Sequence, residues 1–376
     1  MPEVAVLKCS SYNSEVFQVV KNALDSVKAD RLLKDGIKVL IKPNILGPEC
    51  PSKAVTTHPL IIDAVCKYLK NFNVRVFIGE SSGSAASKGT EEAFKKSRIA
   101  EIAEKHNIEF INFDNDKKVI KENKEALILK KIPISKKLSE MDLIINACKL
   151  KTHMLTGYTG AVKNMFGILP GRSKVSAHAL GRDIKKFSNI ILDVYTSLVP
   201  QISIMDAVVG MEGNGPRSGK AKQTGLILAS KNAVALDVTA SKIIGFKPEQ
   251  LMFLKLAKKR NLFPEEISII GEKGIRIPYK KPLTYCLGFL SYFTNTFMRS
   301  MQVSFEADKK KCKACGCCMR ACPQNAIIFK NKTPVWDKKK CIMCYCCHEM
   351  CPHKAVILKK SLIARIADKF TKRFND

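Results

Sequence analysis

Ten of the fifteen cysteines lie between residues 312 and 351, where they form two copies of one spacing. The first copy, CKACGCCMRACP, begins at Cys312, and the second, CIMCYCCHEMCP, begins at Cys341. Each copy has three cysteines spaced C-x-x-C-x-x-C and a fourth that precedes a proline. This run binds 4Fe–4S clusters in bacterial two-cluster ferredoxins, where the fourth cysteine of each copy ligates the other cluster. The chemistry it predicts is one-electron transfer.

The spacing predicts two crossed ligand sets. They are Cys312, Cys315, Cys318 and Cys351 for the first cluster, and Cys341, Cys344, Cys347 and Cys322 for the second. The alternative is a zinc ribbon, but zinc needs only two C-x-x-C pairs and has no use for a repeated C-x3-C-P element. Cys317 and Cys346 occupy the same extra position in both copies and are interpreted as small packing residues, the alternative being that they substitute as ligands.

The charge of the chain bears on its partners. The 376 residues carry a formal net charge of +30, and two oxidised clusters with eight thiolates would lower it by about 4. Such a field attracts anions, so we expect an acidic redox partner such as ferredoxin or flavodoxin. The lysines are scattered and aromatic residues make up only 7% of the chain. Nucleic-acid binding is therefore the weaker alternative.

Two further segments concern location. The N-terminal stretch MPEVAVLKCSSYNSE has no basic leader followed by an apolar run, which together with the many cysteines predicts the reducing cytoplasm. Residues 282–304 form an apolar connector, but it is interrupted by polar residues and Arg299. We expect a helix that covers a cofactor or rests on a membrane surface, not a span. The basic amphipathic tail, 359–376, would dock on the protein itself or on a membrane.

Residues 1–281 alternate between strand-like and helix-like segments. Strands are predicted at 4–10, 37–45, 74–85, 108–114, 126–134, 141–153, 201–210 and 224–230, and helices at 57–71, 90–107, 184–198 and 232–245. This alternation predicts an α/β body with a mostly parallel sheet and helices on both faces. Residues 305–358 form a small C-terminal α+β ferredoxin-like domain. In sheets of this kind, ligands bind beyond the carboxyl ends of the strands.

Polar residues follow three of these strands. They are Lys42 and Asn44, then Glu80 and Ser81, and finally Lys149, Lys151 and His153. The last three alternate along a strand and so share one side of it. Two lysines there would hold an anionic group, and His153 could exchange a proton near neutral pH. The alternative is a solvated strand end.

Two further segments extend the candidate site. Gly160 precedes a short helix that would place Lys163 and Asn164 in its first turn, where backbone N–H groups bind anions. Arg172 and His178 lie on a glycine-punctuated loop, 169–183, that could close over a ligand. His153, Lys151 and His178 are thus the predicted catalytic residues. Neither a P-loop nor a G-x-G-x-x-G fingerprint is present, so we expect electrons to arrive from a protein donor.

Several motifs over residues 38–245 carry a family resemblance. In order they are IKPN, TTHP, IGESSGS, KLKTHMLTGYTGAVKNMFGILPGR, ISIMDAVVGMEGNGPRSG and AVALDVTASKIIG. Together they resemble the domain-of-unknown-function 362 family, whose members often carry a C-terminal two-cluster ferredoxin module. The resemblance implies an iron–sulfur, oxidoreductase-like protein and names no substrate.

Two hypotheses result. The first is an oxidoreductase that passes electrons through two 4Fe–4S clusters to or from a small anionic substrate or cofactor in the body. The second is an electron-transfer subunit or binding module without catalysis of its own. Whether an additional cofactor occupies the body is left open.

Overall fold

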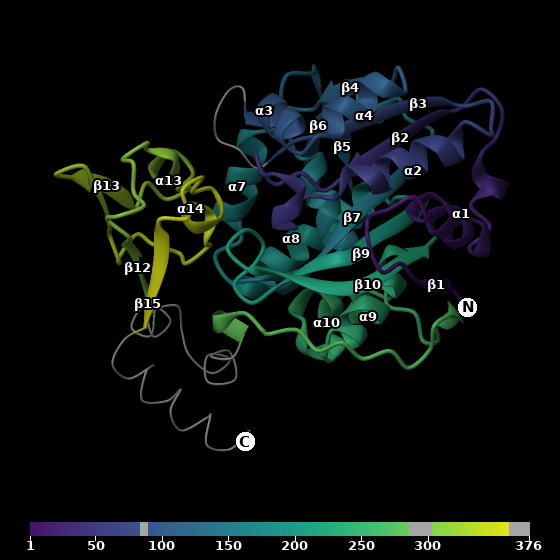
Figure 1. Ribbon diagram of the computed structural model, residues 1–376. Helices are drawn as coiled ribbons and strands as arrows, with labels where there is room; N and C mark the ends of the chain where they lie inside the picture. Colours follow the sequence, from purple (N-terminus) through teal and green to yellow (C-terminus); the bar gives the residue numbers. More distant parts are fainter. Residues whose placement is uncertain (83–88, 286–302, 361–376) are drawn as a thin grey trace.

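The computed structural model describes residues 1–82, 89–285 and 303–360. An α/β body is followed by a small cysteine-rich domain at one side of it (Figure 1). Most of the predicted connector and almost all of the predicted tail fall outside the described residues, and so do their suggested membrane contacts. Among the helices that are described, none is long and apolar enough to cross a membrane.

The described part of the body is built on a nine-stranded mixed sheet. Its strand order is β11-β1-β10-β9-β7-β2-β3-β4, with β8 paired to β7. A parallel block consists of β9 (Ile202–Glu212), β7 (Leu143–His153), β2 (Lys38–Pro43), β3 (Arg75–Glu80) and β4 (Glu109–Asn112). β10 (Lys220–Ser230) is antiparallel to β9 and to β1 (Glu3–Lys8), β11 (Ser268–Gly271) is parallel to β1, and β8 (Gly157–Thr159) is antiparallel to β7. The predicted fold class is confirmed.

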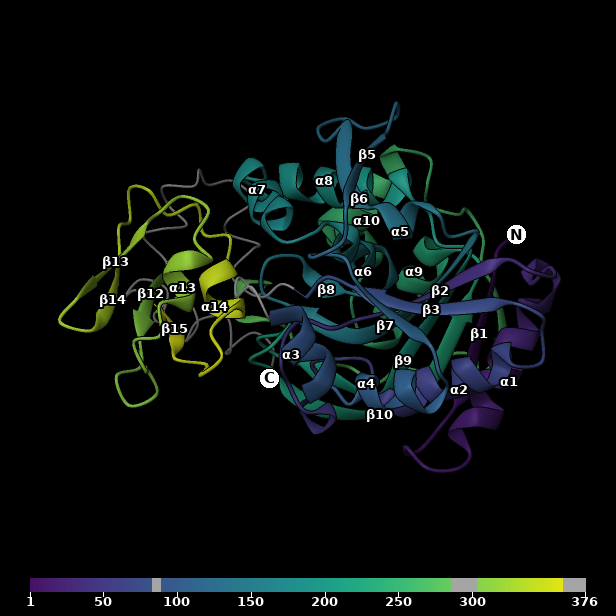
Figure 2. The ribbon, with the colours of Figure 1, turned by 90° about the horizontal axis from the view of Figure 1, so that it is seen from above.

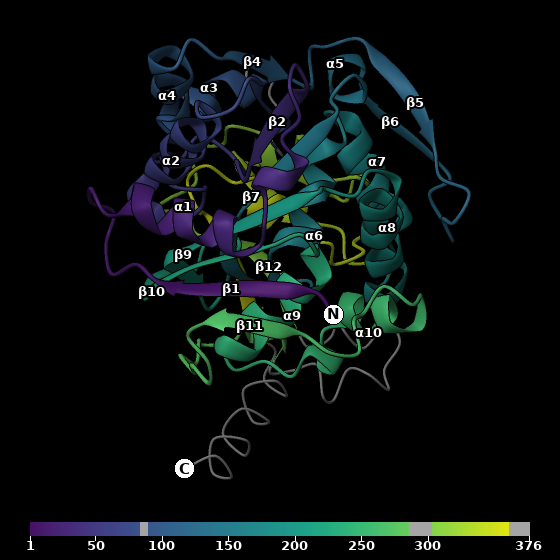
Figure 3. The ribbon, with the colours of Figure 1, turned by 90° about the vertical axis from the view of Figure 1, so that its right-hand side faces the viewer.

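Helices cover both faces of this sheet (Figure 3). One face packs against α1 (Val16–Ser26), α2 (Pro59–Leu69), α3 (Gly89–Lys96) and α4 (Ile99–Lys105). The other packs against α6 (Ala161–Asn164), α8 (Ile184–Ser197), α9 (Ala233–Ile243) and α10 (Met252–Lys259). Every residue of β7 is buried, as expected for a central parallel strand covered on both sides.

The structure corrects three predicted elements. The strand expected at 126–134 is β6 (Lys131–Ser135), which pairs with β5 (Lys118–Glu122) in a separate hairpin. Alternating apolar and polar residues predict a strand, but they do not predict which strand it pairs with. The helix expected at 90–107 is two helices, α3 and α4, which are separated at Arg98 where φ is 63°. The loop expected at 169–183 contains a helix, α7 (Arg172–Leu180).

The small domain repeats its own structure. β12 (Val303–Ala307) pairs with β15 (Val356–Lys360), and β13 (Ile327–Lys330) pairs with β14 (Thr333–Trp336). Each cysteine copy contains one short helix, α13 (Cys317–Arg320) in the first and α14 (Cys346–Glu349) in the second. Viewed from above, α14 is the helix on the side of the body (Figure 2). Met154, at the end of β7, completes the domain's apolar core.

Candidate active site between the body and the cysteine-rich domain

The cysteines fall into the two predicted groups of four. Cys312, Cys315, Cys318 and Cys351 line one hollow, and Cys322, Cys341, Cys344 and Cys347 line another. Equivalent backbone N–H groups, those of Ala326 and Ala355, donate to the Sγ atoms of Cys322 and Cys351, at 3.2 Å in both cases. Donors to sulfur tune the potentials of iron–sulfur clusters. The donor set and its shell therefore fit two clusters.

A cavity of about 110 Å³ lies between the body and α14. Its body wall contains eight of the eleven site residues expected outside the cysteines: Asn44, Glu80, Ser81, Lys151, His153, Lys163, Asn164 and His178. Its opposite wall contains Ala321, Cys346, Glu349 and Met350 from the small domain. The carboxyl ends of the parallel strands thus meet the cysteine-rich domain across this space.

The other three predicted residues lie outside the cavity. Lys42 is buried behind Glu80, and its Nζ lies 2.5 Å from Glu80 Oε2. Lys149 lies deeper in the body, where Nζ donates to Asp206 Oδ2 at 2.7 Å. Arg172 is exposed at the start of α7 and does not line the cavity. Lys149, Lys151 and His153 alternate along β7, but only Lys151 and His153 line the cavity. Lys149 instead forms a buried ion pair with Asp206.

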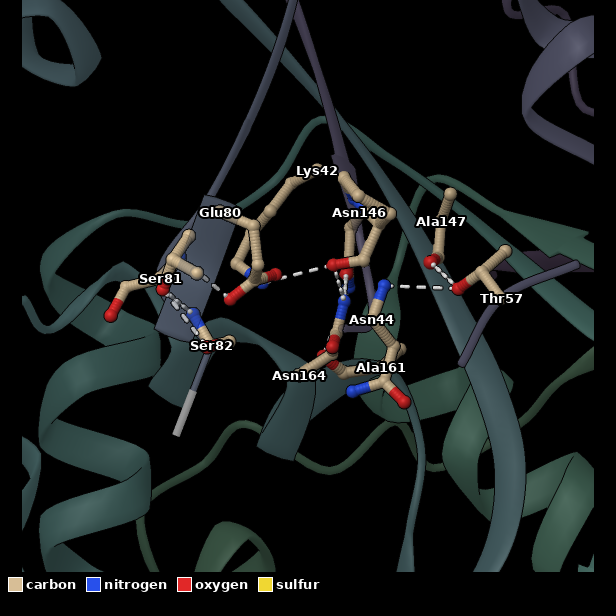
Figure 4. Close-up of polar contacts among 12 residues, drawn as sticks. Lys42, Asn44, Thr57, Glu80, Ser81, Ser82, Asn146, Ala147, Ala161 and Asn164 are labelled. Atoms are coloured by element: carbon tan, nitrogen blue, oxygen red, sulfur yellow. Dashed lines mark hydrogen bonds and ion pairs between the residues drawn. The ribbon is translucent and has the colours of Figure 1, made fainter. Parts of the chain in front are cut away.

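Polar contacts fix the floor of the cavity (Figure 4). Asn164 Nδ2 donates to Asn146 Oδ1 at 2.7 Å, and Asn146 Nδ2 donates to the carbonyl oxygen of Ala161 at 2.9 Å. Glu80 is almost completely buried, and burial raises its pKa, an effect that Lys42 opposes. A Cβ atom on Gly167 would come within 2.3 Å of Glu80 Oε1. A larger residue here would require the buried side chains of Glu80 and Lys42 to shift.

Lys151 and His153 end β7 with their side chains in the cavity wall. Lys151 Nζ donates to Asn44 Oδ1 at 2.5 Å and to the carbonyl oxygen of Val55 at 2.7 Å. Burial lowers the pKa of Lys151 to about 7. His153 Nδ1 accepts from the backbone N–H groups of Leu155 and Thr156, at 3.1 and 3.3 Å. Because Nδ1 is an acceptor, the neutral ring carries its proton on Nε2.

His153 Nε2 faces the small domain. It lies 3.5 Å from Glu349 Oε1, and neither atom has a hydrogen-bond partner within the described residues. Burial holds the pKa of His153 well below the ordinary histidine value. Burial also raises the pKa of Glu349 to about 7. The two atoms are too close together for a ligand to lie between them, but both residues line the cavity, so a ligand there could hydrogen-bond to either atom.

The helices α6 and α7 supply the remaining charged and aromatic side chains. Lys163 is half-buried, with Nζ 6.0 Å from the centre of the Phe166 ring, and burial lowers its pKa. Lys174 donates to the carbonyl oxygen and to Oγ of Ser81, and burial lowers its pKa to about 8. His178 stacks on Phe187 at 4.4 Å and its Nδ1 has no partner among the described residues. Burial lowers the pKa of His178 to about 3, so its ring is neutral.

Two carboxylates position these helices. Asp237 accepts from the backbone N–H groups of Ala161 and Val162, at 2.6 and 2.9 Å, and so caps the helix that carries Lys163. Asp114 accepts from Ser81 Oγ at 2.5 Å and from the backbone N–H of Gly171 at 2.6 Å. Because Asp114 follows β4 and Ser81 follows β3, the two contacts hold the start of α7 beside the ends of both strands.

Arg217 joins the body to the small domain. Its Nε lies 2.7 Å from Glu49 Oε1, and its Nη1 donates to the carbonyl oxygen of Glu349 at 3.0 Å. The Arg217 side chain is only 3% exposed. It therefore fixes α14, and with it the second wall of the cavity.

Sequence reasoning missed Lys174 and Glu349. No sequence signal points to Lys174, because its segment lacks apolar periodicity and predicts a loop where the structure has the helix α7. Glu349 had a usable signal, since it is an acidic residue between two ligand cysteines of a basic domain. Among the described residues, no group of three or more His, Cys, Asp and Glu side chains is placed to hold a single metal ion. The cavity is suited to an anion, because Lys151, Lys163 and Lys174 all line it.

Comparisons with known proteins agree with the predicted resemblance. The family model described as "Domain of unknown function (DUF362)" matches residues 39–242, and a "4Fe-4S dicluster domain" model matches residues 304–352. Over 264 residues the chain is 26% identical to "Thylakoid-associated protein sll1697" of Synechocystis sp., covering 69% of this chain and 80% of that protein. The lactate racemase apoprotein from Thermoanaerobacterium thermosaccharolyticum matches with a TM-score of 0.43 and 16% identity, over 64% of this chain and 57% of the racemase.

Proposed function

The chain belongs to the DUF362 family and carries a 4Fe–4S ferredoxin-type domain, and from this premise we propose that it is an iron–sulfur oxidoreductase acting on a small anion. One observation carries the proposal. The cavity has converging lysines on its body wall and neighbours of the ligand cysteines on its other wall. An anion bound there would contact the lysines of the body on one side and the proposed electron-transfer domain on the other.

The proposal includes two clusters, one for each group of four cysteines. When bound, they supply or accept one electron each. Ala321 and Cys346 line the cavity and directly precede Cys322 and Cys347, which belong to the second group. The bound anion would therefore lie beside the second group.

The residues of the body have separate roles in this proposal. Lys163 and Lys174 hold the anionic group, and Lys151, itself held by Asn44 and Val55, adds positive charge. His153 presents its Nε2–H to the ligand and donates a hydrogen bond or a proton to it. A cavity of about 110 Å³ is smaller than the roughly 150 Å³ that accepts benzene. The ligand is therefore a short carboxylate or an inorganic oxyanion.

The proposed electron donor is an acidic carrier protein such as ferredoxin or flavodoxin, in the reducing cytoplasm. The strongly basic composition supports this, because it speeds encounter with acidic proteins. The cavity ligand and the carrier would then use different surfaces of the molecule.

The test begins with protein purified without oxygen. Native mass spectrometry should find the mass of two 4Fe–4S clusters together with any small molecule that remains bound. The reduced protein is then mixed with a panel of short carboxylates and inorganic oxyanions, and cluster reoxidation is followed by visible absorbance. At least one anion should reoxidise the clusters.

A matched pair of variants assigns the reaction to the cavity. Lys163→Met should lower the rate of anion-dependent reoxidation by at least about tenfold. Lys258→Met is the control. Lys258 lies on the distant helix α10 and, like Lys163, holds its Nζ near an aromatic ring, 5.9 Å from the centre of the Phe263 ring. If no anion reoxidises the clusters while a carrier protein does, the protein is an electron-transfer subunit without catalysis of its own.

A further inference from the structure

The two cysteine copies provide an internal comparison. Aligning Cys312 with Cys341 pairs Met319 with His348 and Arg320 with Glu349. In the second copy, His348 and Glu349 are each only 6% exposed. Glu349 faces the body across the cavity, whereas His348 Nδ1 lies 2.6 Å from the carbonyl oxygen of Val356 in the small domain itself. In the first copy, Met319 is 41% exposed and Arg320 is exposed as well. Equivalent faces of one repeat are therefore covered in one copy and open in the other.

The charges of the two faces are opposite. Glu349 faces a cationic wall of the body, in which Lys163, Lys151 and Arg217 lower its pKa against the effect of burial. The equivalent residue of the first copy, Arg320, is basic and exposed, and so is Lys313 in the same cysteine copy. If an acidic face suits the cationic body, a basic face suits an acidic partner.

The open face also leads to a predicted cluster ligand. Cys315 is exposed, whereas its equivalent, Cys344, is half-buried. Arg320 Nη2 donates to the carbonyl oxygen of Cys315 at 3.0 Å and to Cys317 Sγ at 3.3 Å, so its charge is held against this loop. A protein docked on this face would come into contact with the first group of cysteines.

Further exposed lysines directly precede the first cysteine copy in the sequence. Lys309, Lys310 and Lys311 are exposed directly before Cys312. The nearby acidic residue, Asp308, is engaged by Lys311 at 3.3 Å. Met319 adds an exposed apolar side chain to these basic residues, and protein interfaces combine apolar contacts with a polar rim.

We infer that this open face, formed by Lys309, Lys310, Lys313, Cys315, Met319 and Arg320, is the docking surface for a small acidic protein that carries one electron. The inference deepens the proposed function, on which it rests, by assigning the partner to one face. The carrier is oxidised by one electron and the cluster of the first group is reduced by one. No covalent bond forms or breaks, and no proton is transferred. The second group, on the covered side, then lies between the first group and the cavity.

The experiment uses the full-length protein with its clusters and a reduced plant-type ferredoxin as probe. Stopped-flow absorbance gives the second-order rate constant for reduction of the clusters without any anion in the cavity. Titration calorimetry with the oxidised ferredoxin gives the binding affinity. Lys310→Glu combined with Lys313→Glu tests the open face. Lys338→Glu combined with Lys339→Glu is the control, since these exposed lysines precede Cys341 as Lys309 and Lys310 precede Cys312.

The first pair should lower the rate constant and the affinity by at least about tenfold at low ionic strength, with a smaller effect at high salt. The control pair makes the same change in net charge and should stay within about twofold of the unmodified protein. Equal losses in both pairs, or no loss in either, would overturn the assignment of this face. Displacement of the ferredoxin by a short DNA duplex at physiological salt would also overturn the assignment. Iron and sulfide contents must remain unchanged.

These readouts are independent of the cavity. Failure of every anion to reoxidise the clusters would remove the proposed reaction and leave the docking result intact. A failed docking test would leave the anion result equally intact.

Discussion

Lys42 and Glu80 form a buried ion pair next to the cavity. Their side chains are 0% and 3% exposed, so removing one partner leaves an unpaired charge in the interior. Lys42→Met should lower the free energy of unfolding by about 3–5 kcal/mol. The double variant Lys42→Met with Glu80→Gln should lose less, because no charge is left unpaired. Chemical denaturation of the unmodified protein, Lys42→Met, Glu80→Gln and the double variant measures this. Equal losses in the single and double variants would show that the pair itself matters little.

Anion binding should depend on pH through two lysines and through Glu349, whose pKa burial raises to about 7 and which becomes negative over the same pH range. Burial lowers the pKa of Lys151 to about 7 and that of Lys174 to about 8, so both lose positive charge as the pH rises through this range. The affinity for an anion should then fall by up to about tenfold per pH unit. His153 and His178 should add no step near the ordinary histidine pKa, because burial already keeps both rings neutral.

Calorimetric titrations between pH 6 and pH 9 measure this dependence. Lys174→Arg is the diagnostic variant, since guanidinium keeps its charge throughout and should flatten the fall near pH 8. A constant affinity from pH 6 to pH 9 would contradict the assigned role of both lysines.

How far single residues could be predicted depended on their local signals. Lys151 and His153 could be found, because alternation along a strand and a position at its carboxyl end are both visible in sequence. The pairing of Lys149 with Asp206 could not, since it joins strands 57 residues apart through one hydrogen bond of 2.7 Å. Glu349 reaches the cavity only because the small domain docks against the body. The sequence of the second cysteine copy gives no sign of that docking.

At the scale of elements, the position of α14 depends on Arg217. Replacing this arginine leaves both Glu49 and the carbonyl oxygen of Glu349 without their partner. Arg217→Met should weaken docking by about 3 kcal/mol and speed amide exchange in α14 roughly a hundredfold. Arg98→Met is the control, because the ion pair of Arg98 with Glu101 is exposed and should leave exchange in α14 unchanged. Unaltered exchange in the Arg217 variant would mean that other contacts fix α14.

The elements themselves were largely predictable where periodicity was strong. The parallel block of the sheet followed from strands and helices in alternation, and the helix predicted at 184–198 is confirmed as α8. The helix α7 was missed because its sequence, RSKVSAHAL, has no apolar stripe and buries only Ala177 and His178. It is held from outside, by Asp114 at its start and by Phe166 and Phe187 around His178.

At the scale of the whole molecule, the buried residues form separate cores. Two lie on opposite faces of the large sheet. The third belongs to the small domain and includes three of the predicted ligand cysteines, Cys318, Cys347 and Cys351. We therefore expect this core to depend on bound clusters for folding, since metal binding contributes directly to the stability of small domains.

Removal of the iron should therefore separate the two parts of the molecule. Anaerobic treatment with an oxidant and a chelator should abolish amide protection across residues 303–360, while the body, with its own two cores, keeps its protection. The cavity would then lose the wall formed by Ala321, Cys346, Glu349 and Met350, and anion affinity should fall by at least about tenfold. Hydrogen-exchange mass spectrometry and calorimetry measure both effects, and reconstitution with iron and sulfide should restore them together. If residues 303–360 stayed protected without iron, the small domain would fold on its apolar core alone. If the body also lost protection, the cores of the body and the small domain would be coupled through Met154.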